Sequence, residues 1–336
     1  MKVLVTAEQL HRPVPGGIAT YINGLRQGLA SVTDGPDALF WEPGRVPVRL
    51  LTRAWAIGLM RPRPAADVVH ATTIAMPPAT GVPRSVFVHD VAWRAHPDAY
   101  PARGRRWHER ALRRAVAGAD LLMTPAEETA DALRAAGVER VHVVAHGCDH
   151  LPPPDHDAAG RLLAGVGVTG DFLLSVSTLE PRKNMTRLLA AFRAARPLLP
   201  DPSWPLVVVG PTGWGPRMTQ EPGVVLAGPV PAGALAALYA RARLLAYVPL
   251  TEGFGLPPLE AMAACTPVVA SPLPGTGDAA HVVDPLDVDA IADGLARVAS
   301  DDGLRSRLVT AGLLRAGELT WAASARRHVE LWRSMT

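Results

Sequence analysis

Short apolar segments alternate with segments of helical spacing along the whole chain, and this alternation restricts the fold more than any other feature. In the first half, buried strands are expected at residues 2–6, 67–70, 85–88, 120–123 and 140–145. Helices are expected at 18–30, 102–117 and 127–136. Apolar strands that alternate with helices are typical of a parallel sheet with both faces covered. The first half is therefore predicted to be an α/β domain.

A proline run then interrupts the alternation. Leu151-Pro152-Pro153-Pro154-Asp155 cannot continue a helix or a central strand, because proline fixes φ and lacks the backbone N–H. The pattern then resumes, with strands expected at 172–176, 206–209, 223–226, 244–248 and 267–270, and helices at 184–199, 232–242, 288–297, 302–317 and 320–335.

We predict an α/β protein with two Rossmann-like domains, residues 1–155 and 156–318. The C-terminal helix, within 319–336, is expected to pack back on the first domain. The two parallel sheets are expected to face a central cleft, because such sheets bind ligands beyond the carboxyl ends of their strands.

The composition fits an ordinary globular protein. The 336 residues are 48% hydrophobic and carry a formal net charge of +3, which is too mild to indicate nucleic-acid binding. No apolar run approaches the roughly 18 residues that span a bilayer, and Glu8 comes too early for a signal peptide. The cysteines, Cys148 and Cys265, imply no disulfide framework, so a cytoplasmic location is expected.

The segment 251–263 carries the clearest chemistry. Gly253 and Gly255 follow an apolar strand, and a helix starts behind them with Glu260 expected in its first turn. Bare amides at a helix N-terminus attract anions, and glycines let a phosphate approach the backbone closely. Glu252 and Glu260 can accept hydrogen bonds from hydroxyl groups. A purely structural role stays open as an alternative, because the helix dipole also favours acids near a helix start.

Lysine is rare in this chain. Of the 34 basic residues only Lys2 and Lys183 are lysine, so the lysine beside Arg182 calls for an explanation. Two cations after the first strand of the second domain can neutralise a diphosphate as it leaves. A compact ammonium group reaches a single oxygen in a way that a guanidinium does not. A solvated helix start is the alternative.

Several motifs together resemble the retaining glycosyltransferases of family 4. They are Gly16-Gly17-Ile18-Ala19, Val88-His89-Asp90-Val91, Leu179-Glu180-Pro181-Arg182-Lys183-Asn184, Gly210-Pro211-Thr212-Gly213-Trp214-Gly215 and Glu252-Gly253-Phe254-Gly255-Leu256-Pro257-Pro258-Leu259-Glu260. The resemblance covers nearly the whole chain. Its His-Asp pair and its Pro-Arg-Lys-Asn loop are most similar to the bacterial mannosyltransferase subgroup. The resemblance implies the GT-B fold, with two Rossmann-like domains.

The resemblance also implies roles for single residues. Those assigned to catalysis are His89, Arg182, Lys183 and Glu252, and those assigned to the donor nucleotide are Gly16, Gly17, Arg182, Lys183, Phe254, Gly255, Leu256 and Glu260. Glu260 would accept the ribose hydroxyls, while Glu252 and His89 would contact the transferred sugar. Asp90 would cap the next turn or orient the acceptor. Family members are thought to react on one face of the sugar, so no protein nucleophile is expected.

The implied function is transfer of a hexose, mannose above others, from a nucleotide-diphosphate sugar such as GDP-mannose. The acceptor would be a glycan, a lipid-linked compound or a small molecule, and neither a cofactor nor a metal is expected. A catalytically idle sugar-nucleotide-binding subunit of a glycan assembly complex is the main alternative. A nicotinamide dehydrogenase is disfavoured, because residues 6–11 lack the Gly-x-Gly-x-x-Gly turn.

Two patterns suggest metal sites, and both have better explanations. Asp287-Val288-Asp289 is an Asp-x-Asp triplet, but it opens a predicted helix, so capping is expected. His142, His146, Cys148 and His150 have the composition of a zinc site. On a strand, however, His142 and His146 would lie roughly 13 Å apart, too far for one ion.

Two segments leave questions open. The arginine-rich segment 103–114, which contains Trp107, is a solvated face, a contact with an anionic acceptor, or a weak peripheral contact with anionic lipid at the inner membrane face. In the loop 273–280, relatives usually carry a glutamate after the proline and one further residue. The loop is therefore shorter here, and its effect on the fit of the donor or acceptor stays open.

Overall fold

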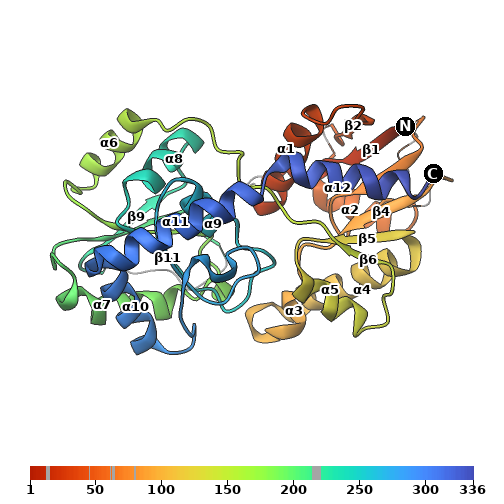
Figure 1. Cartoon of the computed structure of the whole chain (residues 1–336). Helices are drawn as coiled ribbons and strands as arrows, with labels where there is room; N and C mark the ends of the chain where they lie inside the picture. The colour runs from red at the N-terminus through yellow and green to blue at the C-terminus, as the bar shows by residue number, and fades with distance from the viewer. Residues whose placement is uncertain (13–15, 45, 61, 63–64, 79–80, 214–220) are drawn as a thin grey trace. The chain divides into compact units, whose positions relative to one another are not determined.

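The computed structural model describes residues 1–12, 16–44, 46–60, 62, 65–78, 81–213 and 221–336. These residues form two compact units, Met1–His150 together with Leu319–Thr336, and Leu151–Glu318. Within the described residues, each unit contains one six-stranded sheet with helices packed against it (Figure 1). The first unit ends at His150 rather than at Asp155, whose N–H donates to Gly233 O in the second unit.

All the strand pairs of the first sheet are parallel. The strands are β1 (Lys2–Thr6), β2 (Asp37–Trp41), β3 (Val68–Ala71), β4 (Arg84–Phe87), β5 (Leu121–Thr124) and β6 (Val141–Val143), in the spatial order β2-β1-β3-β4-β5-β6. β3 and β5 are buried along their whole length, as expected for central strands covered on both faces.

Helices cover both faces of this sheet. They are α1 (Gly17–Ala30), α2 (Val48–Ala56), α3 (Ala92–Ala95), α4 (Ala102–Gly118), α5 (Glu127–Arg134) and α12 (Trp321–Arg333), with the short turns η1 (Glu8–His11) and η2 (Pro97–Ala99). Phe87 packs in a core with α1 and α12, whereas its neighbour Val86 packs in a core with α4 and α5. Because successive strand residues point to opposite faces, these cores lie on opposite sides of the sheet.

The C-terminal helix α12 packs on the first unit, as the sequence predicted. Trp321 at its start is wholly buried. A Cβ added at Gly24, Gly28 or Gly147 would come within 2.0 to 2.1 Å of an atom of Trp321. Because these three positions lack a Cβ, the start of α12 can pack closely against them.

The second sheet is also parallel in each strand pair. Its strands are β7 (Leu173–Val176), β8 (Leu206–Val209), β9 (Val224–Gly228), β10 (Leu244–Tyr247), β11 (Val268–Ala270) and β12 (His281–Val282), in the order β12-β11-β10-β7-β8-β9. Its helices are α6 (His156–Gly165), α7 (Met185–Ala195), α8 (Ala232–Arg241), α9 (Leu256–Ala263), α10 (Val288–Ser300) and α11 (Asp302–Glu318), with η3 (Pro181–Lys183), η4 (Arg196–Leu198) and η5 (Gly277–Ala279).

The predicted fold class, α/β with two Rossmann-like parallel sheets, is confirmed. The helix expected at 184–199 is shorter than predicted: α7 ends at Ala195, and the separate 3-10 turn that begins at Arg196 contains Pro197. In the described part of the chain, no helix combines the length and the apolar character needed to cross a bilayer. Trp214 and Gly215, quoted above for one motif, lie outside the described residues.

Candidate functional site

Most of the predicted site residues lie in the loops after two neighbouring strands of the second unit or in helix α9, which follows one of these loops. β7 pairs with β10, so the carboxyl ends of both strands lie at the same edge of the sheet. The loop after β7 contains Arg182 and Lys183, and the loop after β10 contains Glu252. The N–H of Leu250 donates to Arg182 O over 2.8 Å, and this bond joins the two loops.

Glu252 is the centre of a compact ion cluster. Its Oε2 accepts hydrogen bonds from Arg182 Nη1 at 3.1 Å and Tyr247 OH at 2.8 Å, and it also pairs with Lys183 Nζ. Lys183 Nζ donates to Tyr247 OH at 2.7 Å as well. On its other side, Arg182 Nε lies 2.5 Å from Glu180 Oε1. We refer to these five residues as the ion cluster.

The ion cluster is largely withdrawn from solvent. The side chains of Lys183, Glu252 and Arg182 are 10%, 15% and 18% exposed. Burial by itself would raise the pKa of Glu252, but the charges of Arg182 and Lys183 outweigh burial and hold the pKa of this carboxyl well below its usual range. Burial lowers the pKa of Lys183, while the Glu252 carboxylate opposes that shift. Glu252 is therefore ionised at neutral pH.

Asn184 fixes the backbone that presents the two cations. It has φ 59° and ψ 28°, a left-handed conformation that asparagine adopts more readily than most residues. Its Nδ2 donates to Val248 O at 3.0 Å and to Pro285 O at 2.7 Å. The side chain therefore ties η3 to the end of β10.

The start of α9 presents backbone donors close in sequence to Glu252. Gly255 has φ +94°, which side chains with a Cβ rarely adopt. Pro257 and Pro258 occupy the first turn and carry no N–H. Among the described residues, neither the N–H of Gly255 nor that of Leu256 donates to a backbone carbonyl. Phe254 is buried, and its carbonyl accepts from the N–H of Gly275 at 2.8 Å.

Glu260 lies in the second turn of α9, not in the first turn as predicted, because the helix begins at Leu256. The residue is 8% exposed, and its Oε2 accepts a hydrogen bond from Tyr239 OH at 2.7 Å. The carboxylate is thus held in place by α8, and its contact with a ribose stays a prediction.

In the first unit, His89 follows β4 as a neutral imidazole. Its Nε2 donates to Thr72 O at 2.9 Å, so Nδ1 carries the lone pair. Burial lowers the pKa of His89 to about 4. The ring lies 5.0 Å from that of Tyr21, centroid to centroid. The neighbouring Asp90 accepts a hydrogen bond from the N–H of Ala92 at 3.0 Å. Of the two roles expected for Asp90, this contact matches capping of the next turn.

Gly16 and Gly17 stand at the start of α1. Gly16 is the N-cap residue with φ −131°, an extended conformation that other residues can adopt. A Cβ added at either glycine would meet no atom within 4 Å. Among the described residues, neither the backbone conformation nor the packing requires glycine at positions 16 and 17.

The residues suspected of metal binding have other contacts. Asp287 caps α10 as predicted, because its Oδ1 accepts from the N–H groups of Asp289 and Ala290 at 2.9 and 3.0 Å. His146 is buried against the ring of Phe87, with centroids 5.2 Å apart. Within the described ranges, no group of three or more His, Cys, Asp or Glu side chains is placed to hold a metal ion.

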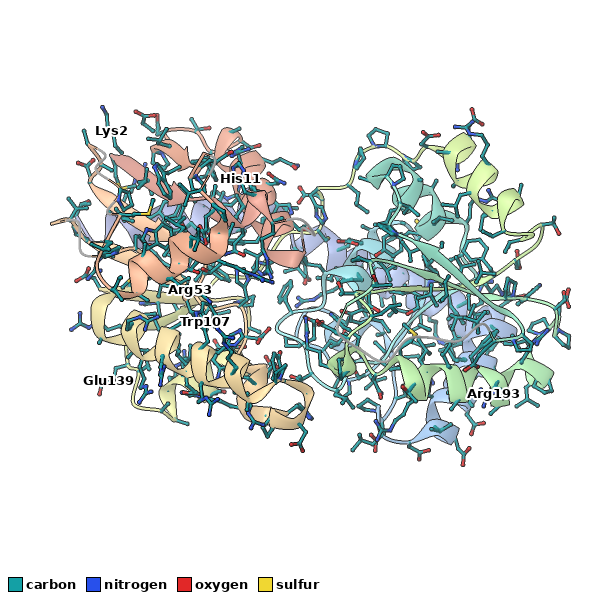
Figure 2. All side chains as sticks on the ribbon, turned by 180° about the vertical axis from the view of Figure 1, so that it is seen from behind. Lys2, His11, Arg53, Trp107, Glu139 and Arg193 are labelled. Carbon is teal, nitrogen blue, oxygen red and sulfur yellow. The ribbon has the colours of Figure 1, made fainter. Side chains whose placement is uncertain are left out.

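The arginine-rich segment forms the first part of α4. Trp107 on this helix is 39% exposed and is labelled in Figure 2. Glu109 pairs with Arg94 at 2.7 Å, and this hydrogen-bonded partner lowers the pKa of the Glu109 carboxyl to about 2. Lipid contact by this helix stays a prediction.

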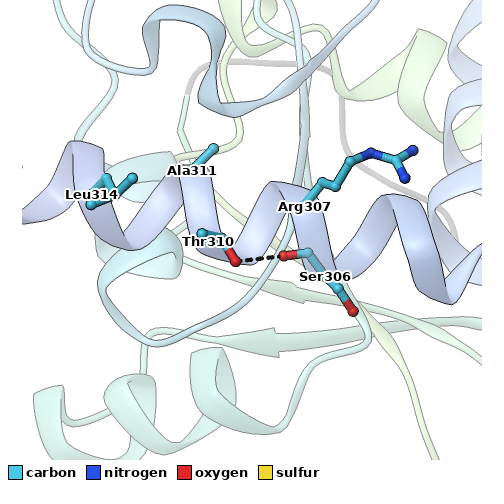
Figure 3. A pocket seen from close by; sticks show the side chains of 5 residues that line it. All are labelled: Ser306, Arg307, Thr310, Ala311 and Leu314. Atoms are coloured by element: carbon cyan, nitrogen blue, oxygen red, sulfur yellow. Dashed lines mark hydrogen bonds between the residues drawn. The ribbon is translucent and has the colours of Figure 1, made fainter.

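A hollow on α11 is shown in Figure 3. It is lined by Ser306, Arg307, Thr310, Ala311 and Leu314. All five residues belong to one helix, and none of them is a predicted site residue. The ion cluster remains the best candidate site.

Comparison with known proteins places the chain in a family. Residues 15–150 match the family described as Glycosyltransferase Family 4, and residues 170–301 match the family described as Glycosyl transferases group 1. The chain belongs to the family 4-like glycosyltransferases. The predicted family is thereby confirmed.

Two relatives illustrate the sequence similarity. The glycosyltransferase-family chain is 31% identical to O-antigen chain mannosyltransferase B of Escherichia coli over 250 residues, which are 69% of this chain and 65% of the relative. It is 32% identical to a D-inositol 3-phosphate glycosyltransferase of Corynebacterium efficiens over 273 residues, which are 73% of this chain and 63% of the relative. The chain thus spans a little under two thirds of these curated relatives.

Solved structures share the fold. Sucrose-phosphate synthase from Thermosynechococcus elongatus has a TM-score of 0.72 and 18% identity, covering 99% of this chain and 98% of that one. Anabaena HepE, solved in complex with UDP and glucose, also has a TM-score of 0.72 and 18% identity, covering 99% and 100%. These structures support the GT-B fold for this family member.

Sequence reasoning missed several residues of the candidate site. Glu180, Tyr247, Asn184 and Tyr239 had no role assigned to them. The chain has only four tyrosines, and two of them donate to the motif glutamates Glu252 and Glu260. The scarcity of tyrosine, like that of lysine, was therefore a usable signal.

Proposed function

We propose that this chain is a retaining glycosyltransferase that moves a hexose, with mannose as the first candidate, from a nucleotide-diphosphate sugar to a glycan or glycoconjugate. The ion cluster carries this proposal. It sets Arg182 and Lys183 at the carboxyl edge of a parallel sheet, where Rossmann-like domains bind nucleotides. The amides of Gly255 and Leu256 follow the neighbouring strand and add donors for a phosphate.

In the proposed reaction, the bond from the anomeric carbon to the diphosphate oxygen breaks as the acceptor oxygen bonds to that carbon. The departing phosphate takes the acceptor's proton. Arg182 and Lys183 stabilise the negative charge that develops on the diphosphate. Because two fixed cations supply this charge, the proposed reaction needs no metal.

The state of Glu252 supports a contact with the sugar rather than a role as nucleophile. In the protein without a sugar-nucleotide donor, three hydrogen-bond donors converge on Oε2, and the lowered pKa of the carboxyl makes it a weak base and a poor nucleophile. Among the described residues, Oε1 makes no hydrogen bond and can accept one from a sugar hydroxyl. This fits a reaction on one face of the sugar without a covalent intermediate.

The remaining predicted residues take supporting roles in this proposal. Neutral His89 offers Nδ1 as an acceptor for a sugar hydroxyl. Gly16 and Gly17 let a phosphate approach the N-terminus of α1, which would explain why glycine stands at two positions that do not need it. Glu260, held by Tyr239, accepts the ribose hydroxyls.

The donor and acceptor classes rest on the relatives. The mannosyltransferase relative supports mannose, and GDP-mannose is the donor that follows. The relatives named for D-inositol 3-phosphate make that compound a second acceptor to test beside mannose-containing glycans.

Turnover with a panel of sugar nucleotides tests the proposed function. Nucleotide release would be measured with GDP-mannose, GDP-glucose, UDP-glucose and UDP-galactose, with each acceptor and without it. We expect release that depends on the acceptor, and an NMR spectrum of the product with the anomeric configuration of the donor. Binding of a donor without turnover would favour the idle subunit instead, and an inverted product would exclude the retaining reaction.

A weak contact of α4 with anionic lipid is a separate part of the proposal. Trp107 and the arginines around it would lie against the lipid surface. Flotation with phosphatidylglycerol vesicles should recover more protein than flotation with phosphatidylcholine vesicles, and Trp107→Ala should reduce the difference. Equal recovery from both vesicle types would remove this contact.

A further inference from the structure

The charges of the ion cluster cancel. Arg182 and Lys183 are matched by the carboxylates of Glu180 and Glu252, and both cations point at Glu252 Oε2. A cluster without net charge attracts a diphosphate far less than two uncompensated cations would. The Glu252 carboxylate therefore pairs with the same two cations that the diphosphate of a donor would contact.

Glu252 and Glu180 are held differently. Glu180 is 6% exposed and precedes η3 as its N-cap residue, so it is part of the same turn as Arg182. Glu252 is more exposed and belongs to the loop between β10 and α9, where it is followed by Gly253 and the left-handed Gly255. Of the two carboxylates, Glu252 has the backbone and the exposure that permit it to turn.

We propose that Glu252 is a counter-ion that the diphosphate displaces, and that this exchange lets the site distinguish the intact donor from the nucleoside diphosphate product. This inference rests on the proposed function. When a donor binds, Glu252 leaves the cations and its carboxylate accepts hydroxyl groups of the sugar. When the sugar has been transferred, those hydroxyls are gone from the nucleotide, so Glu252 returns to Arg182 and Lys183 and competes with the product.

The backbone contacts around the cluster allow such an exchange. The N–H of Leu250 bonds to Arg182 O, and Asn184 bonds to Val248 O, so both cations stay in place when Glu252 turns. Lys183 keeps its bond to Tyr247 OH, and Arg182 keeps Glu180. The movement is thus confined to the Glu252 side chain and its loop, which contains Gly253 and Gly255.

Titration calorimetry with GDP, GDP-mannose and inorganic pyrophosphate tests the exchange, with UDP and UDP-glucose as a second nucleotide pair. We expect Glu252→Gln to bind GDP and pyrophosphate about tenfold more tightly than the wild type, because one competing charge is gone. GDP-mannose should gain less, because the carboxylate contact with its sugar is lost. The preference for donor over product should therefore fall in the variant.

Glu180→Gln is the matched control, since it also removes one carboxylate from Arg182 but not the one that is displaced. It should tighten binding of GDP by less than Glu252→Gln does, because the Glu180 carboxylate contributes to the charge balance but is not displaced by the diphosphate. If it tightens GDP binding as much as Glu252→Gln does, the effect is that of general charge and the inference is wrong.

Tyr247→Phe provides a second variant that leaves the charge unchanged. It removes one donor to Glu252 Oε2, so GDP should bind about threefold more tightly. If both Glu252→Gln and Tyr247→Phe bind GDP no more tightly than the wild type, this inference is wrong, while the proposed function is unaffected. A wild-type protein that binds neither nucleotide pair would instead contradict the proposed function itself.

Discussion

The hydroxyl of Tyr21 lies 2.9 Å from Nε2 of His328, and this contact joins the first long helix of the chain to the last. His328 Nδ1 donates to Ser324 O at 2.8 Å, so its Nε2 is the acceptor for Tyr21. His70 Nε2 must then donate to the Tyr21 oxygen, at 2.8 Å. Both imidazoles are neutral, since burial lowers the pKa of His328 to about 4 and that of His70 well below its usual range.

Replacing Tyr21 with Phe should destabilise the first unit by about 2–4 kcal/mol, because the variant leaves two buried ring nitrogens without their partner. Urea unfolding followed by tryptophan fluorescence would measure this, since Trp321 and Trp332 are buried in the same core. A double-mutant cycle with His328→Gln should show coupling between the two positions. Strictly additive losses would contradict the hydrogen-bond chain.

The first unit should lose stability in mild acid. His70, His89, His146 and His328 are buried with lowered pKa values, each chiefly because of burial. Below about pH 6.5 these histidines take up protons in the unfolded chain but not in the folded one. The stability that the four neutral histidines contribute is therefore fully present above that pH and is lost as the pH falls toward about 4. The free energy of unfolding should fall by up to about 5 kcal/mol per pH unit where all four histidines stay neutral in the folded chain.

Unfolding free energies at several pH values between 7.5 and 5 would check this acid effect. Buried Glu8 has a raised pKa, again through burial, and works in the opposite direction, so the measured slope should be smaller near pH 5. His328→Gln should reduce the slope by about one proton. Stability that does not change with pH between 7 and 5 would refute the neutral, buried state of these histidines.

Gly28→Ala should destabilise the chain by about 2–4 kcal/mol, because the new Cβ would lie 2.1 Å from the carbonyl oxygen of Trp321 and the backbone must shift. Gly17→Ala is the matched control in the same helix, with no atom within 4 Å of its Cβ. We expect the control to stay within about 1 kcal/mol of the wild type. Thermal unfolding of both variants gives the comparison, and equal midpoints would disprove the close packing of α12 at Gly28.

Glu260→Ala should weaken donor binding while the fold survives. The distinguishing measurement compares GDP with 2′-deoxy-GDP. If Glu260 accepts the ribose hydroxyls, the wild type prefers GDP by about fivefold or more, and the variant loses this preference. A preference that persists in the variant would show that Glu260 only supports Tyr239.

The sequence predicted the central strands, because each is a short apolar run buried on both faces, as Val68–Ala71 and Leu206–Val209 are. It did not predict β2, since this edge strand is only partly buried and Leu39 is 57% exposed. α6 was missed behind the proline run, although Asp155 caps it through the N–H of Ala158.

For the site, local motifs identified Arg182, Lys183 and Glu252 but not their mutual neutralisation. That arrangement depends on contacts between residues some 70 positions apart, such as Lys183 with Glu252, which are 69 apart. No local pattern encodes such a contact. The position of Glu260 was misjudged by one turn, although Pro257 and Pro258, which are favoured in the first turn of a helix, indicate a start near Leu256.

The central claim, that Lys183 and its neighbours hold the diphosphate of a sugar nucleotide, is tested most directly by titrating GDP-mannose into the Lys183→Ala variant. Lys2→Ala is the control, because it removes the chain's other lysine from an exposed position. We predict that Lys183→Ala binds the donor at least about tenfold more weakly, while Lys2→Ala binds as the wild type does. Equal donor affinity in wild type and Lys183→Ala, with both proteins folded, would contradict the account.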